Sequence, residues 1–69
     1  MNDGFLNITG NVSQKQLVRR IKYSLKHYRR AWFVSWKLDT ETISELAEQA
    51  KCDWLYSPET GEVRFFEFM

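Results

Sequence analysis

The residues that could do chemistry in this chain are basic, and they recur at helical spacing. At 100° per residue, one arc of a helix collects six cations with a tyrosine at its edge: Lys15, Arg19, Lys22, Lys26, Arg29, Arg30 and Tyr23. Lys and Arg side chains neutralise phosphates with release of counterions, and an aromatic ring among them can stack on an exposed base. The pattern predicts a surface that binds the phosphate backbone of DNA or RNA. A solvated helix face without a ligand is the alternative, because every amphipathic helix has a polar side.

Charge is divided unequally along the 69 residues. Residues 1–38 carry eight Lys or Arg against Asp3, a net +7, and residues 39–69 carry two Lys or Arg against eight Asp or Glu, a net −6. Such asymmetry indicates a charged partner or the pairing of two copies. We therefore expect nucleic acid (DNA or RNA) or another protein as the partner, and a homodimer as the assembly. A two-fold dimer is favoured because head-to-tail pairing tends to build rings or filaments.

Aromatic side chains provide a second candidate surface. If helices cover one face of a sheet, the other face meets water or a partner, and an exposed apolar patch is typical of a docking site. The expected anchors for a protein partner are Phe33, Trp54, Tyr56 and Phe65. Both faces of the C-terminal hairpin carry aromatic residues, so the sequence leaves open which set packs beneath the helices. Stacking of bases on the sheet is a further alternative.

Groups for catalysis or metal binding are sparse. His27 is the only imidazole and Cys52 the only thiol, so a Cys–His pair or a metal site lacks ligands. Residues 42–47 resemble the first helix of a helix-turn-helix in pattern, but strand pattern follows where a recognition helix should lie. The sequence thus predicts a non-enzymatic, nucleic-acid-associated regulatory or accessory domain without a cofactor. The alternative is an interaction module or inhibitor that docks a protein partner through its sheet.

The compartment is predicted from the cysteine count and from hydropathy. A single unpaired Cys52 in so small a chain favours a reducing environment. The longest apolar run, residues 31–34, is far shorter than the roughly 20 residues of a membrane-spanning helix. We expect a cytoplasmic protein that has no membrane partner and forms a single domain over residues 1–69.

Two helices are predicted. The first spans residues 13–30, with Ser13 and Gln16 as a capping box. Its core stripe is formed by five residues: Leu17, Val18, Ile21, Leu25 and Tyr28. The second helix spans residues 41–51, and residues 39–42 offer N-caps for it, including Thr42 with Glu45 as a capping box.

The remaining segments predict strands. Residues 31–38 alternate with period two, and residues 5–9 do so weakly. Residues 54–57 and 62–68 flank a Pro-Glu-Thr-Gly turn, which sets a register with Trp54 opposite Phe65 and Tyr56 opposite Val63. The expected fold is α+β: a single-layer antiparallel or mixed sheet of three to four strands, covered on one face by two helices. Its order is (β)αβαββ, with the hairpin at the C-terminus.

Overall fold

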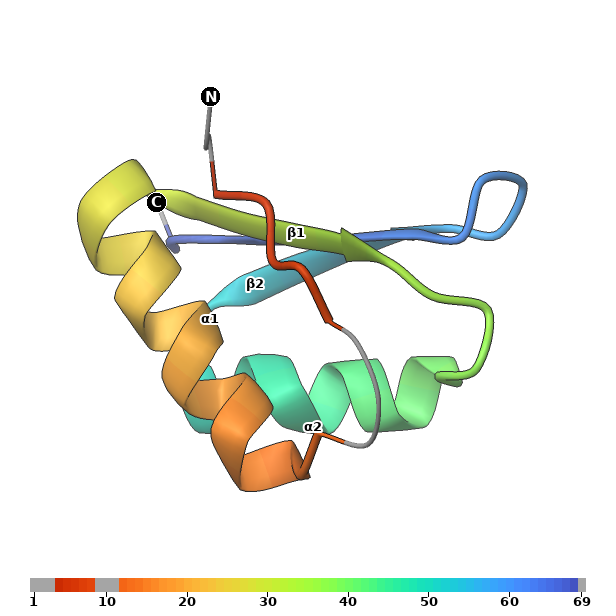
Figure 1. Ribbon diagram of the computed structural model, residues 1–69, viewed down its shortest axis with the longest axis horizontal. Coiled ribbons are helices and arrows are strands. Elements are labelled where there is room, and N and C mark those ends of the chain that lie inside the picture. The colour runs from red at the N-terminus through yellow and green to blue at the C-terminus, as the bar shows by residue number, and fades with distance from the viewer. Residues whose placement is uncertain (1–3, 9–11, 69) are drawn as a thin grey trace.

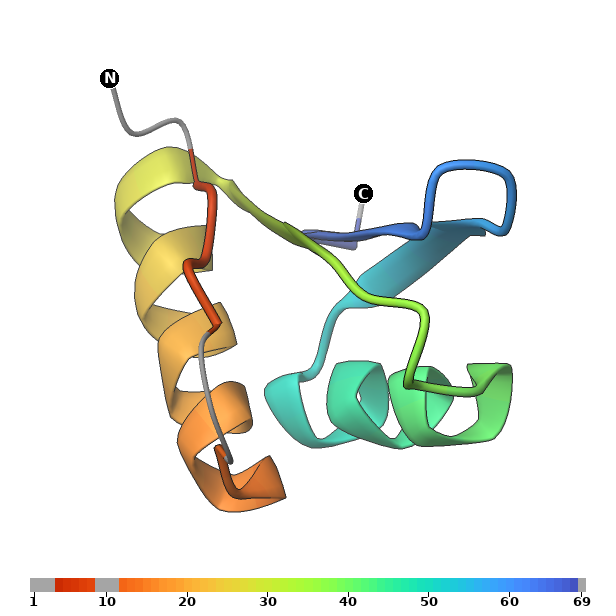
Figure 2. The same cartoon turned by 45° about the vertical axis from the view of Figure 1, so that its right-hand side comes forward.

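The computed structural model of the protein describes residues 4–8 and 12–68. Its elements follow the order α1 (Gln14–Tyr28), β1 (Arg30–Val34), α2 (Thr40–Ala50), β2 (Asp53–Ser57) and β3 (Glu62–Phe66). The strands form one antiparallel sheet in the order β1-β3-β2, so the last strand lies in the middle (Figure 1). Both helices lie on the same side of this sheet, and its other face is open (Figure 2). The expected layering of two helices on one sheet face is confirmed.

Helix α1 begins where the sequence predicts and is shorter at its C-terminal end. The Ser13 side chain accepts the N–H of Gln16 at 3.2 Å, which caps the helix. Arg29 ends the helix in the left-handed conformation, with φ 63°. Four residues of the predicted stripe are buried, but Tyr28 is 38% exposed and Ser24 is buried in its place.

The predicted end of β1 is wrong, and the structure selects one of the predicted caps of α2. Strand β1 ends at Val34 and not at residue 38, because the chain turns so that the Ser35 N–H donates to the Gly61 carbonyl and the Trp36 ring lies against Gly61. Among the caps that residues 39–42 offer, Asp39 is the N-cap of α2, because its carboxylate accepts the Thr42 N–H at 2.8 Å, and Thr42 lies in the first turn of the helix. Hydrogen bonds from the Thr42 side chain and backbone hold the pKa of this carboxyl below its ordinary value.

The C-terminal hairpin forms in the predicted register. Ser57 faces Glu62, Tyr56 faces Val63 and Trp54 faces Phe65. Gly61 closes the turn with φ 71°, and its N–H donates to the Ser57 carbonyl at 2.8 Å. The positive φ explains why a glycine stands at this position.

The core lies between the helices and one face of the sheet. Phe33 and Phe65 meet there with ring centroids 6.0 Å apart, and both side chains are essentially fully buried. Ala31 and Val63 complete this face, with Trp54 and Tyr56 packed at its side. Because side chains alternate between the two faces along a strand, the remaining residues of the three strands lie on the open face: Arg30, Trp32, Val34, Asp53, Leu55, Ser57, Glu62, Arg64 and Phe66.

Residues 4–8 lie along the edge of β1 and do not form the predicted first strand. Within the described residues they make a single bridge, Phe5 to Trp32, and the sheet has three strands. The backbone of Trp32 accepts the Leu6 N–H and donates to the Gly4 carbonyl. The buried Ser24 hydroxyl lies 2.7 Å from the Arg30 carbonyl and 3.3 Å from the Gly4 carbonyl, and donates a shared hydrogen bond to both. Thr9, the last residue of the predicted strand, lies outside the described residues.

Candidate nucleic-acid interface

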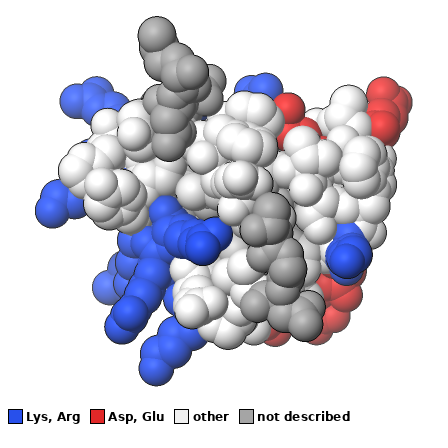
Figure 3. Space-filling view, in the orientation of Figure 1, with Lys and Arg blue, Asp and Glu red and all other residues white. Residues whose placement is uncertain are grey.

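Four of the six predicted cations lie on the exposed side of α1: Lys15, Arg19, Lys22 and Lys26. The prediction that Arg29 and Arg30 belong to the same helical arc is wrong, because Arg29 is the C-cap of α1 and Arg30 is the first residue of β1. These two residues continue the surface at the C-terminal end of the helix. We call this surface the basic helix face; all its members are exposed: Lys15, Arg19, Lys22, Lys26, Arg29 and Arg30. Figure 3 shows Lys and Arg gathered over the α1 side of the molecule and most Asp and Glu on the opposite side. The division of charge along the sequence is therefore also a division of charge in space.

The basic helix face is not neutralised from within the described part of the chain. The one ion pair found there joins Arg64 and Glu62 on the open sheet face. The first turn of α1 contains no acidic residue. Uncompensated cations on one surface produce a positive potential that attracts polyanions.

Aromatic rings lie beside the basic helix face. Tyr23 is 63% exposed, and its ring centroid lies 4.2 Å from that of His27, one helical turn later. His27 in turn lies 6.4 Å from the Tyr28 ring. Arg20, on the same flank, is held differently, because its guanidinium donates to the Asn7 carbonyl at 3.3 Å. The geometry places Tyr23 where an unstacked base could lie beside the cations.

The predicted anchors for a protein partner are misplaced, and the structure corrects them. Phe33 and Phe65 are 1% and 0% exposed, because α1 and α2 cover the face on which they lie. Trp54 and Tyr56 share that face and pack against the same core. These four residues stabilise the fold, and the open face is formed by the alternate residues of each strand.

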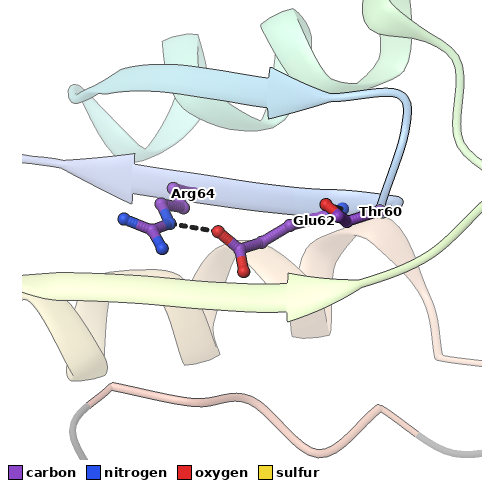
Figure 4. A network of polar contacts seen from close by, with 3 residues as sticks. All are labelled: Thr60, Glu62 and Arg64. Atoms are coloured by element: carbon purple, nitrogen blue, oxygen red, sulfur yellow. Dashed lines mark hydrogen bonds and ion pairs between the residues drawn. The ribbon is translucent and has the colours of Figure 1, made fainter.

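The open face contains a groove that sequence reasoning did not find. Its polar and aromatic walls are Arg30, Trp32, Arg64 and Phe66, over a volume of about 230 Å³. Trp32 lies opposite Arg64 and Arg30 lies opposite Phe66 in the β1–β3 pairing, which joins segments more than 30 residues apart. The Arg64 guanidinium is paired through Nε with the Glu62 carboxylate (Figure 4), and Thr60 accepts the Glu62 N–H. The sequence did not predict that β1 pairs with β3, and this pairing is what brings the four residues together.

The single thiol has no catalytic setting. Cys52 is 3% exposed, and burial raises the pKa of its thiol to about 11, with a smaller contribution from the Asp53 carboxylate. A thiol with so high a pKa is protonated at neutral pH and is a poor nucleophile. Within residues 4–8 and 12–68, no three His, Cys, Asp or Glu residues lie close enough to hold a metal ion.

Comparison with protein-family models, with curated proteins and with solved structures gives no match for this chain. None of the helices in the described residues has the length and apolar character needed to cross a membrane.

The helix ends provide a matched pair of substitutions. Arg29 and Lys51 end α1 and α2 with φ 63° and 57°, a conformation that costs a non-glycine residue about 1–2 kcal/mol. Glycine at either position should raise the free energy of unfolding by about 1 kcal/mol, as measured by urea denaturation. Only Arg29→Gly should also weaken nucleic-acid binding, although both variants lose one positive charge. Equal affinities of the two variants would contradict the assignment of Arg29 to the interface.

Stability should fall at alkaline pH because of Cys52. The native thiol has a pKa of about 11 and the unfolded thiol an ordinary value near 9.0, so between these values the native state keeps a proton that the unfolded state loses. The contribution of Cys52 is therefore complete below pH 9 and decreases by at most about 1.4 kcal/mol per pH unit between the two pKa values. Urea denaturation under reducing conditions measures this slope. In a Cys52→Ala control, the free energy of unfolding should decrease less steeply with pH. Identical slopes for the two proteins would contradict the assignment of this pH dependence to Cys52.

Proposed function

We propose that this protein is a non-enzymatic accessory or regulatory domain that holds the phosphate backbone of DNA or RNA against the basic helix face. The observation that carries the proposal is the set of exposed cations on α1, none of which is ion-paired within the described residues. Phosphate contacts of this kind supply most of the affinity for nucleic acid and do not depend on its sequence.

The shape of the basic helix face supports a linear polyanion as the ligand. Four of its cations, Lys15, Arg19, Lys22 and Lys26, recur every three or four residues along α1, so they follow one line about 16 Å long at 1.5 Å per residue. Phosphates of one strand also recur along a line. A compact anion such as free phosphate would contact only one or two of these side chains at a time.

The proposal assigns no catalytic step to the chain. The thiol is buried and protonated, and the imidazole of His27 packs between two tyrosine rings on the surface of α1. The chemistry of the exposed surface is that of charge pairing and ring stacking, which suits a binding module.

The proposal includes a homodimer in which two copies meet at the outer edge of β2. This strand pairs only with β3, so its other edge is uncovered by the described residues. Pairing there would leave the basic helix faces of both copies exposed. Sedimentation equilibrium tests this part, and a monomer at all concentrations would remove it without affecting the phosphate contacts.

Salt dependence of binding tests the proposal directly. The probes are a labelled generic DNA duplex and a labelled single-stranded RNA, titrated with protein at about 50 and 200 mM salt, with fluorescence anisotropy as the readout. About five phosphate contacts on the duplex would lower its affinity roughly 10²- to 10³-fold across this range. Absence of binding to both probes at the lower salt concentration would overturn the proposal and favour a protein as the partner.

A further inference from the structure

We propose that the groove on the open sheet face receives one unstacked nucleobase, which makes single-stranded nucleic acid the preferred ligand of this protein. This inference rests on the proposed function, because the basic helix face supplies the phosphate contacts on either side of the base. It adds a second binding surface, formed by Trp32, Arg64 and Phe66, to the first.

The groove has the chemistry that stacking requires. Trp32 and Phe66 present aromatic rings, and Phe66 is 38% exposed although it lies in the central strand. The Phe5 ring packs on Trp32 with centroids 4.7 Å apart and a tilt of 57°. This contact fixes the Trp32 ring before a ligand arrives, which lowers the entropy lost on binding.

The size of the groove favours a single planar group. Its volume of about 230 Å³ is below the roughly 300–1,000 Å³ of sites that enclose a whole small-molecule ligand. A guanidinium plane and two aromatic rings around so small a space suit one base, because bases stack on both kinds of surface. A base inside a duplex is covered by its neighbours and cannot enter.

The groove and the basic helix face are continuous. Arg29 ends α1 and Arg30 begins β1, so one side chain belongs to the helix end and the next lines the groove. Figure 1 shows this junction at the α1 side of the sheet, beside the C-terminal end of β3. A strand whose phosphates follow α1 therefore ends next to the groove.

Acidic residues limit the groove on its other sides. Asp53 lies opposite Phe66 on the β2 side, and Glu62 lies toward the hairpin turn, where it pairs with Nε of Arg64. The Arg64 side chain is 59% exposed despite this pair. Because these carboxylates repel phosphates, the strand should lie on the Arg30 side of the groove. A Glu62→Gln substitution removes one of the two negative charges and should increase affinity for the single strand.

The first experiment compares two probes that carry the same number of phosphates, an oligothymidine and a DNA duplex, by anisotropy at low salt. Wild type should bind the single strand more tightly. Trp32→Leu and Phe66→Leu should each weaken single-strand binding by roughly 5- to 150-fold, which corresponds to the loss of one stacked base, with duplex binding unchanged. Trp36→Leu is the matched control, because Trp36 is 67% exposed and lies outside the groove. Thermal melting confirms that each variant is folded.

A second readout detects stacking itself. With Trp36 and Trp54 replaced by phenylalanine, Trp32 is the only indole in the chain. Oligothymidine should quench its emission in a saturable manner, and the duplex should not. Saturable binding without a change in Trp32 emission would overturn the inference.

The two proposals fail in different ways. If both probes bind with strong salt dependence but the Trp32 and Phe66 variants behave like Trp36→Leu, the phosphate surface remains and the base site is wrong. If neither probe binds at low salt, the basic helix face fails as well. If the groove variants change only the association state of the protein, the open face is a protein interface and the base site is overturned.

Discussion

Replacing Arg19 and Lys26 together by alanine should weaken binding to DNA and RNA of any sequence roughly 10- to 100-fold at about 50 mM salt. The two side chains lie on the exposed side of α1, and alanine preserves the helix, so the loss should arise from phosphate contacts. The slope of log affinity against log salt should flatten by about 1.8 for a duplex and about 1.4 for a single strand. Anisotropy titrations over a salt series measure both quantities.

A variant with the same loss of charge elsewhere provides the control. Lys37 and Lys51 are exposed and lie outside the basic helix face. The Lys37→Ala, Lys51→Ala double variant should keep its affinity and its salt slope nearly unchanged. Equal losses in the two double variants would show that binding depends only on net charge, and would remove the basic helix face as a defined site.

Gly4→Ala should lower the free energy of unfolding by roughly 2–4 kcal/mol. The residue has φ 99°, and an added Cβ would lie 2.4 Å from the Arg30 carbonyl oxygen. Backbone strain contributes about 1–3 kcal/mol, and the overlap adds to it because a carbonyl in a strand cannot move aside. The variant should also detach residues 4–8 from β1, which removes the hydrogen bond between the Gly4 carbonyl and the Trp32 N–H. Urea denaturation and hydrogen exchange at Trp32 are the measurements.

Gly61 provides the comparison for this effect. It also has a positive φ, but its added Cβ would meet the Trp36 ring, an exposed side chain that can rotate away. Gly61→Ala should therefore cost only the backbone strain, about 1–2 kcal/mol. Equal losses at the two glycines would contradict the account in which the rigidity of the neighbouring atom sets the cost.

Local signals were sufficient for much of the fold. The Ser13 cap and the turn from Pro58 to Gly61 are short-range features, so the start of α1 and the hairpin register could be predicted from the residues alone. The same is true of the cations on α1, because helical spacing and exposure follow from one periodic pattern. Their binding to nucleic acid remains a prediction.

Features set by long-range packing could not be predicted. Residues 31–34 present apolar side chains to both faces, and the larger tryptophan is on the open side while Ala31 lies beneath the helices. Size and hydrophobicity gave no reason to prefer that arrangement, so the docking surface was assigned to the wrong face. Ser24 was overlooked for a similar reason: a buried hydroxyl is satisfied only by carbonyls that the fold brings from Gly4 and Arg30.

The central position of β3 has a consequence for how the chain acquires its structure. Strands β1 and β2 both pair with β3 and not with each other, so the three-stranded sheet cannot form until residues 62–66 are present. Before that point, the only strand-like pairing among the described residues is the bridge between Phe5 and Trp32. During synthesis, the segments that form α1, β1, α2 and β2 are made before β3, so they have no sheet to pack on until the last strand is complete. Until then the chain is open and exposes its aromatic residues. Such an intermediate exposes apolar surface and is prone to aggregate. Completion of β3 should therefore organise the sheet and core in one cooperative step, and a chain that stops at residue 61 should not fold.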